Sequence, residues 1–163
     1  MCIESIVSAQ RAYFAKGETL DIAFRKAALK KLRSVLLARE NEINAALLKD
    51  LNKSASESYM CEVGMTLAEL NYVLVHLDRW ARRHPVLTPL AQFHARSFTV
   101  HNPYGVVLIM SPWNYPFMLT MEPLIGALAA GNCCVVDVVI TCTSANDNFQ
   151  LWSVIHHFLV DDI

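Results

Sequence analysis

Basic residues are missing from the second half of this sequence. All 14 Lys and Arg lie at or before Arg96, whereas residues 97–163 carry five acids and no basic side chain. An independently folded domain needs a charged, solvated surface, so we expect this half to be covered by protein outside the chain. The alternative is a half that is unusually buried within the chain. The formal net charge of −1 also excludes a global attraction to nucleic acid.

Signals for export or membrane insertion are also missing. The opening residues MCIESIVSAQRAYF lack a basic leader followed by an apolar block, so no secretory signal is predicted. The longest apolar stretch, residues 123–140, is interrupted by Asn132 and Asp137 and has no basic flanks. Such a stretch is more typical of a buried core than of a membrane span. We therefore expect a cytoplasmic protein without a membrane span.

The cysteines and histidines form no recognisable framework. There is no CxxC motif, and the adjacent Cys133 and Cys134 would point to opposite faces of a strand. The cysteines are therefore predicted to be small buried hydrophobic side chains in a reducing compartment. His156 and His157 are adjacent, which places them on different faces of a helix or strand, so no metal site is predicted.

The first part of the chain, residues 1–85, has helical periodicity. One helix is predicted over 3–16, with Gly17 ending it. A second is predicted over 21–51, with Asp21 as its N-cap. The third is predicted from Ser54 to Trp80, because Ser54 and Glu57 have the spacing of a capping box. We interpret this part as an N-terminal helical segment.

The period then changes to that of strands. Residues 86–102 alternate in part and indicate a hairpin or edge strands. Residues 105–110 form a short apolar run typical of a strand buried on both faces. A helix over 123–130, with Pro123 in its first turn and Gly131-Asn132 as its stop, leads to a second buried strand at 133–136.

This order predicts an α/β fold. The N-terminal helical segment precedes the first strand–helix–strand unit of a Rossmann-like doubly wound sheet, truncated after its second strand. We place the boundaries at 1–85, 86–102, 103–136 and 137–163, the last range being a divergent tail.

The turn SPWNYPFMLT at 111–120 places an asparagine between two aromatics and two prolines. By themselves, Trp113, Tyr115 and Phe117 are most simply interpreted as core packing. Asn114 alone would be a turn-forming or helix-capping asparagine.

A longer stretch changes that interpretation. PYGVVLIMSPWNYPFMLTMEPLIGALAAGNCCVV, residues 103–136, resembles the start of the cofactor-binding domain of NAD(P)-dependent aldehyde dehydrogenases. It is most similar to the class 3 branch, which includes fatty aldehyde dehydrogenases. The segments FRKAALKKL and EVGMTLAELNYVLVHLDRW resemble the same branch, and the resemblance covers roughly residues 5–136. It implies oxidation of an aldehyde to a carboxylic acid, with NAD or NADP as the cofactor.

The resemblance also implies residue roles. Asn114 would be an oxyanion donor, because its amide N–H can stabilise the oxygen that becomes negative when a thiolate attacks the aldehyde. The wall beside the cofactor would be formed by Ile109, Met110, Ser111, Pro112 and Trp113. The aldehyde channel would be lined by Tyr115, Met118 and Leu119.

The resemblance ends at residue 136. The family continues with Lys-Pro-Ser-Glu, whose lysine and glutamate bind the adenosine ribose, whereas this chain has Asp137, Val138, Val139 and Ile140. The tail contains no general-base glutamate or nucleophilic cysteine of the family, and neither Cys133, Cys134 nor Cys142 is a candidate replacement.

We therefore expect a fragment of an aldehyde dehydrogenase that is inactive as this chain alone. Such a fragment could form a homo-oligomer or hetero-oligomer. The alternatives are a non-catalytic interaction or oligomerisation fragment and a degraded gene product.

Overall fold

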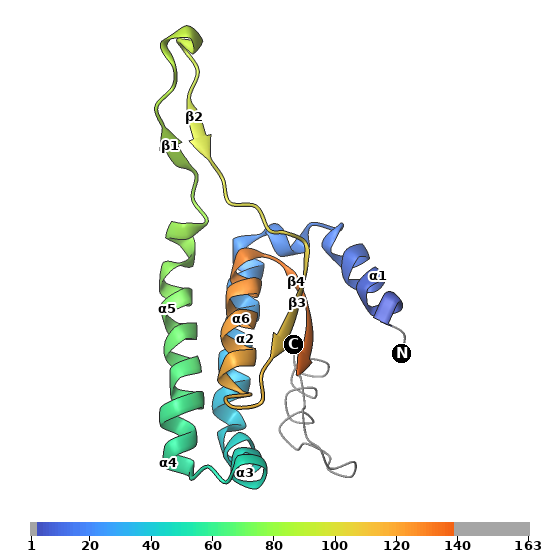
Figure 1. Ribbon diagram of the computed structural model, residues 1–163. Coiled ribbons are helices and arrows are strands. Elements are labelled where there is room, and N and C mark those ends of the chain that lie inside the picture. Colours follow the sequence, from blue (N-terminus) through green and yellow to red (C-terminus); the bar gives the residue numbers. More distant parts are fainter. Residues whose placement is uncertain (1–2, 139–163) are drawn as a thin grey trace.

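The computed structural model describes residues 3–138, which form a helical layer beside two small sheets (Figure 1). The helices α2, α5 and α6 lie beside one another, and α1 lies apart from them, against the strands β3 and β4. The predicted mixed α/β fold is confirmed. The tail from residue 139 onward, with Cys142, His156 and His157, lies outside the described residues, as does Cys2.

The first two predicted helices form with different bounds. Helix α1 spans Ile3–Phe14, two residues shorter at its end than predicted, and Gly17 follows it in the left-handed region at φ 78°. Asp21 caps the next helix as expected, because its carboxylate accepts hydrogen bonds from the backbone N–H groups of Ala23 and Phe24.

The prediction of one helix over 21–51 is wrong. The structure has α2 at Ile22–Ala38 and α3 at Glu40–Leu51, separated at Arg39 with φ −108° and ψ 14°. The apolar residues of both segments are nevertheless buried in one core. A change of direction at Arg39 allows them to face that core from two sides, which a straight helix of this length would prevent.

The third helical segment contains a wide turn. Ser54 accepts a hydrogen bond from the N–H of Glu57, as the capping box predicts. The short helix α4, Ala55–Ser58, then passes through the π-helical segment η2, Tyr59–Val63, into α5, Gly64–Trp80. A Cβ at Gly64 would lie 2.7 Å from the Tyr59 backbone oxygen, so glycine is needed beside this turn. The helix ends at Trp80, as predicted.

The predicted hairpin is present. Strand β1, His84–Val86, pairs antiparallel with β2, Ser97–Thr99, with Pro85 opposite Phe98. The hairpin extends well beyond the helices (Figure 1), and a single turn of 3-10 helix, Leu90–Gln92, lies between its strands. Apolar side chains in the outer part of the hairpin are exposed to solvent: Leu87 is 99% exposed and Leu90 is 92% exposed.

The strand–helix–strand unit is parallel, as predicted. Strand β3, Val106–Ser111, pairs with β4, Cys133–Val138, from Val106 opposite Cys133 onward. Helix α6, Met118–Ala130, connects them and ends at Gly131 with φ 87°. The Asn132 side-chain oxygen accepts a hydrogen bond from the N–H of Gly105, which fixes the end of the helix to the start of β3.

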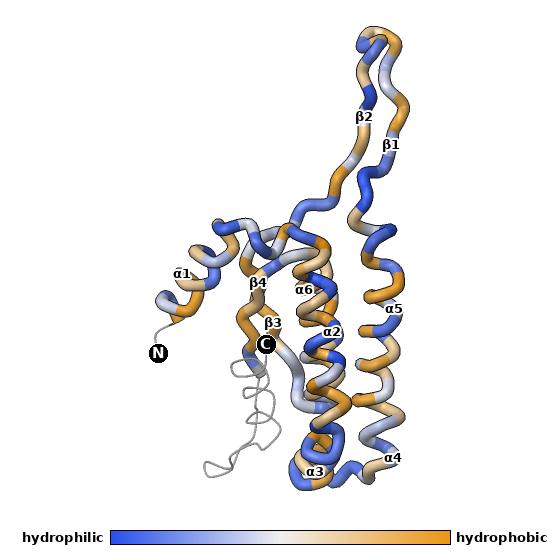
Figure 2. Tube along the Cα trace, turned by 180° about the vertical axis from the view of Figure 1, so that it is seen from behind, coloured by the Kyte–Doolittle hydropathy of each residue, from blue (hydrophilic) through white to orange (hydrophobic). Residues whose placement is uncertain are grey.

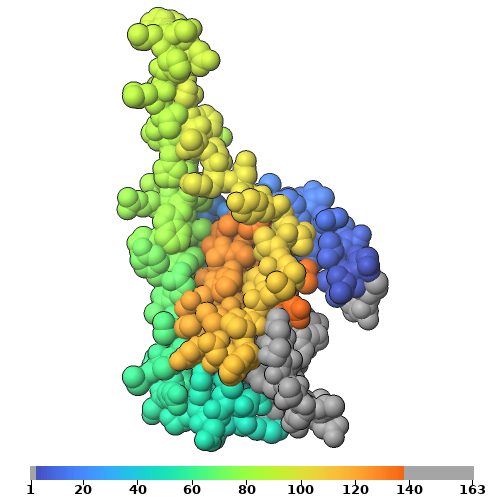
Figure 3. All heavy atoms as spheres, viewed as in Figure 1, coloured from blue at the N-terminus to red at the C-terminus, as the bar shows by residue number. Residues whose placement is uncertain are grey.

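Two features of this unit differ from the predictions. Helix α6 begins at Met118, so Pro123 lies inside it and not in its first turn. Strand β3 is buried on one face only: Ile109 and Ser111 are buried, whereas Leu108 and Met110 are 60% and 65% exposed. A strand is buried on both faces only where each face is covered, and within residues 3–138 one face remains partly open (Figure 3).

One apolar core joins the helices to the unit. It contains side chains of α2, α3, α5, α6 and β3, including Leu32, Leu47, Leu70, Ile109 and Ile125. Apolar residues also lie along β3, β4 and the hairpin (Figure 2). No helix within residues 3–138 is both long enough and apolar enough to span a bilayer.

Candidate active site

The site is the turn between β3 and α6, residues 112–117. The Ser111 hydroxyl donates a hydrogen bond to the Pro116 backbone oxygen, 3.2 Å away, and Thr120 donates to the same oxygen. Both hydroxyl-bearing residues are buried. The residues that flank the turn, Ser111 and Thr120, are therefore both hydrogen-bonded to the backbone oxygen of Pro116. These two bonds hold the ends of the loop together.

A carboxylate from another part of the chain caps the helix that follows. Oε2 of Glu62 accepts hydrogen bonds from the backbone N–H groups of Phe117 and Met118, at 2.8 Å and 3.2 Å. These are among the N–H groups that a helix leaves without intrahelical partners. A negative charge at this position also interacts favourably with the helix dipole. Glu62 is fully buried and comes from η2, 55 residues before Phe117.

A lysine completes the arrangement. Lys53 forms an ion pair with Oε1 of Glu62, donates a hydrogen bond to the Asn114 backbone oxygen at 3.2 Å, and lies 4.1 Å from the centre of the Tyr115 ring. Lys53 is 8% exposed. The pair therefore brings two opposite charges into the interior and directs their remaining contacts to this turn.

The predicted oxyanion donor lies on the outside of the turn. Asn114 is exposed, as are Pro112 and Trp113, while Phe117 is fully buried. Asn114 does not cap α6, because Glu62 does so. The core-packing interpretation of the three aromatics holds for Phe117 alone, since Trp113 is 58% exposed and Tyr115 is 39% exposed.

The residues predicted beside the cofactor alternate in direction. Ile109 and Ser111 face the interior, whereas Met110, Pro112 and Trp113 are exposed. The exposed members lie at the carboxyl end of a parallel strand, where α/β folds bind ligands.

The residues predicted in the substrate channel follow the same turn. Tyr115, Met118 and Leu119 each keep part of their surface exposed, and Met118 and Leu119 belong to the first turn of α6. Tyr115 therefore follows Asn114 directly in the sequence, and Met118 and Leu119 come four and five residues after it.

Lys53 and Glu62 were not singled out from the sequence. Glu62 precedes Thr66 by four residues and Leu70 by eight, and both of those are fully buried on α5. An acidic residue at a position that continues the helical spacing of the buried residues indicates a buried charge. That spacing could have indicated Glu62, but nothing local indicates its partner.

The thiols of Cys133 and Cys134 are poorly suited to nucleophilic attack. Burial raises the pKa of the Cys133 thiol. The pKa of the Cys134 thiol is raised to about 12, first by burial and secondly by the electrostatic effect of the neighbouring Cys133. A thiol held protonated is a poor nucleophile. Residues 3–138 contain no cluster of three metal-ligating side chains.

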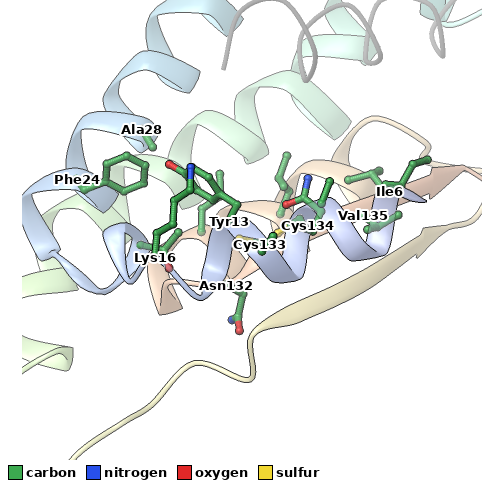
Figure 4. Close-up of a pocket in the computed structure, with 16 residues that line it drawn as sticks. Ile6, Tyr13, Lys16, Phe24, Ala28, Asn132, Cys133, Cys134 and Val135 are labelled. Atoms are coloured by element: carbon green, nitrogen blue, oxygen red, sulfur yellow. The ribbon is translucent and has the colours of Figure 1, made fainter. Parts of the chain in front are cut away.

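Two clefts lie away from this turn. A cleft of about 960 Å³ is bounded by α1, the start of α2 and strand β4, with Tyr13, Lys16, Phe24 and Cys133 among its lining residues (Figure 4). Another lies between the base of the hairpin and α5 and α6. None of the predicted site residues lines either cleft.

Comparisons with known proteins agree with the fold. The sequence model of the aldehyde dehydrogenase family matches residues 1–141. The 4,4'-diaponeurosporen-aldehyde dehydrogenase of Staphylococcus aureus is 44% identical over 126 residues, which are 77% of this chain and 28% of that relative. The dimeric NADP-preferring aldehyde dehydrogenase of Canis lupus familiaris is 38% identical over 135 residues, 82% of this chain and 30% of that relative.

A solved structure gives the same result. The substrate-bound state of Staphylococcus aureus AldH is similar with a TM-score of 0.81 and 42% identity, covering 83% of this chain and 30% of that one. The chain thus spans less than a third of the length of each of these relatives. By its sequence and its fold, this chain belongs to the aldehyde dehydrogenase family.

Proposed function

We propose that this chain supplies the oxyanion-stabilising part of an NAD(P)-dependent aldehyde dehydrogenase, with the Asn114 carboxamide as the donor. The observation that supports this role is the construction of the turn: its backbone is fixed from inside by Glu62, Lys53 and Ser111, while Asn114 remains on the outside. A donor fixed before reaction needs no reorganisation when charge develops.

The chemistry requires a thiolate from outside the described residues. When such a thiolate bonds to the aldehyde carbon, the carbonyl π electrons move to oxygen, and the Asn114 N–H would donate to that oxygen. Aspartate at this position would repel the developing charge, whereas asparagine donates without losing a proton. One such donor contributes about 3–4 kcal/mol in a dry site.

The described residues fit a nicotinamide cofactor in part. Met110, Pro112 and Trp113 give an apolar surface, suited to a ring, at the carboxyl end of β3. When bound, the cofactor would accept the hydride that leaves the aldehyde carbon. Residues 97–138 contain no Lys or Arg to pair with its phosphates, and Asp137 is exposed where a cation would be needed. Residues 97–138 therefore suit the ring and not the phosphates.

The proposed substrate is an aldehyde with an apolar chain. Tyr115, Met118 and Leu119 adjoin Asn114 and carry no charge, so they would favour an alkyl or aryl group over a polar one. The relative from Staphylococcus aureus is named for 4,4'-diaponeurosporen-aldehyde.

A fused enzyme tests the role of Asn114. Residues 1–138 would replace the matching part of the Staphylococcus aureus relative, and aldehyde-dependent NADH formation would be measured for the parent fusion and two variants. Asn114→Ala is expected to lower kcat by about 10²–10³ with little change in KM. Asn41→Ala, at an exposed position of α3, is the matched control and should change kcat less than about twofold. A folded fusion without activity, or an active Asn114→Ala variant, would contradict the proposal.

A second candidate is a non-catalytic interaction fragment. The exposed apolar residues of β3 and of the hairpin favour a partner that covers them, and one relative is described as dimeric. Co-expression with a complete relative, followed by light scattering, would detect a hetero-oligomer of defined mass. Aggregates of variable mass would argue against this role.

A further inference from the structure

The buried pair Lys53–Glu62 makes all its other described polar contacts with one short segment. Glu62 binds the N–H groups of Phe117 and Met118, and Lys53 contacts the Asn114 oxygen and the Tyr115 ring. We propose that Lys53 and Glu62 are positioning residues. They hold the 112–117 turn in the conformation that places the Asn114 side chain on the outside of the turn. The geometric part of this proposal stands alone, and its catalytic consequence rests on the proposed role of Asn114.

Stability alone does not account for the pair. Two charges lose their hydration when they enter the interior, and a buried ion pair can often be replaced by apolar residues without loss of stability. Here Glu62 is fully buried and Lys53 is 8% exposed, in a region otherwise rich in apolar side chains. What apolar residues could not supply is an acceptor for two helix N–H groups and a donor for a turn carbonyl.

The two residues divide the turn between them. Glu62 fixes its end, where the chain enters α6, and Lys53 fixes its middle, at Asn114 and Tyr115. Because the ion pair joins the two, movement of one half of the turn would pull on the other. The backbone on both sides of the Asn114 side chain is thereby restrained from inside the molecule.

The local backbone serves this arrangement. The π-helical segment η2 ends at Val63, and both Glu62 and Val63 lie in the interior. Asn52, in the left-handed region at φ 55°, ends α3 immediately before Lys53.

Amide hydrogen exchange by NMR on the 163-residue chain is the primary test. In the parent, Phe117 and Met118 should exchange at least about tenfold more slowly than Glu40 and Asn41 at the start of α3, whose N-cap residue makes no side-chain capping bond. Equal rates in the folded parent would contradict the proposal before any variant is made.

Three variants then separate positioning from general stability. Glu62→Gln and Lys53→Met remove one charge each, and both should accelerate exchange at Phe117 and Met118 and shift the Asn114 side-chain amide signals, while α2 amides such as Leu32 change far less. Lys53→Arg keeps the charge and should restore slow exchange. The control Lys26→Met removes the more exposed ion pair with Asp78 and should leave the turn unchanged. Uniform acceleration of all amides would show a merely structural role and overturn the proposal.

The fused enzyme gives the catalytic readout. Lys53→Met and Glu62→Gln are expected to lower kcat at least about tenfold with KM nearly unchanged, because the donor is displaced and not removed. Altered exchange at Phe117 and Met118 with unchanged kcat would contradict the role of Asn114 while leaving the positioning intact. Unaltered exchange would contradict the positioning itself, whatever the activity.

Discussion

Arg25 on helix α2 donates a hydrogen bond to the backbone oxygen of Ala129, 3.2 Å away, at the end of helix α6. The same guanidinium binds the backbone oxygens of Thr19 and Leu20. One side chain thus joins the helical segment to the strand–helix–strand unit across 104 residues, next to the glycine that ends α6.

Gly131→Ala should destabilise the chain. Gly131 has φ 87°, and an added Cβ would lie 2.7 Å from the Arg25 guanidinium. Backbone strain of about 1–2 kcal/mol and displacement of Arg25 both oppose the change, so we expect the free energy of unfolding to fall by about 2–3 kcal/mol in urea denaturation. Gly126→Ala is the control: this helical glycine has nothing within 4 Å of an added Cβ, and the change should stabilise by about 0.4–1 kcal/mol. Equal effects would refute the role of Gly131.

Glu122→Gln should stabilise the chain at neutral pH. Burial, and secondly the nearby Glu69 carboxylate, raises the pKa of Glu122. The folded chain therefore binds this proton more tightly than the unfolded chain, and the resulting stability is complete below the ordinary carboxyl pKa and is lost as pH rises through the raised value. We expect a gain of up to about 0.5 kcal/mol at pH 7 and none at acid pH, measured by urea denaturation at both.

Glu69→Gln provides the comparison for Glu122. It removes the neighbouring charge but not the burial of Glu122, which is the leading cause of the raised pKa. It should therefore give a smaller gain than Glu122→Gln. A gain for Glu122→Gln that is the same at both pH values would show that the charge of Glu122 is not responsible.

Cys134 should resist alkylation in the folded chain. With a pKa of about 12, about one thiol in 10⁴ is a thiolate at pH 8, whereas an exposed cysteine is ionised to a substantial extent. Labelling with iodoacetamide, followed by peptide mass mapping, should show at least about 100-fold slower modification of Cys134 in the native chain than in the urea-unfolded chain. Rapid native labelling would mean that the strand opens or that the thiol is activated.

The chain alone should produce no aldehyde-dependent NADH. It contains the proposed oxyanion donor Asn114, but the thiols of Cys133 and Cys134 are held protonated by burial. The measurement is absorbance at the NADH band with an alkyl aldehyde and either NAD or NADP, with the intact Staphylococcus aureus relative as the positive control. Turnover that is lost in Asn114→Ala would overturn the expectation.

The sequence alone determined most of the elements and the family. Helical and strand periods, the Asp21 and Ser54 caps, the hairpin, and the Gly131-Asn132 stop are local patterns, and each is found in the structure. Period and capping depend on neighbours within a few residues, which is why one sequence suffices to find them.

Only the tertiary structure decided where α6 begins and how its turn is held. Pro123 suggested a helix start, but α6 begins at Met118, because Glu62, far away in the chain, caps it. Lys53 likewise reaches Asn114 across 61 residues. The partner of a buried charge is set by which segments pack together in space, and no local pattern in the sequence contains that information.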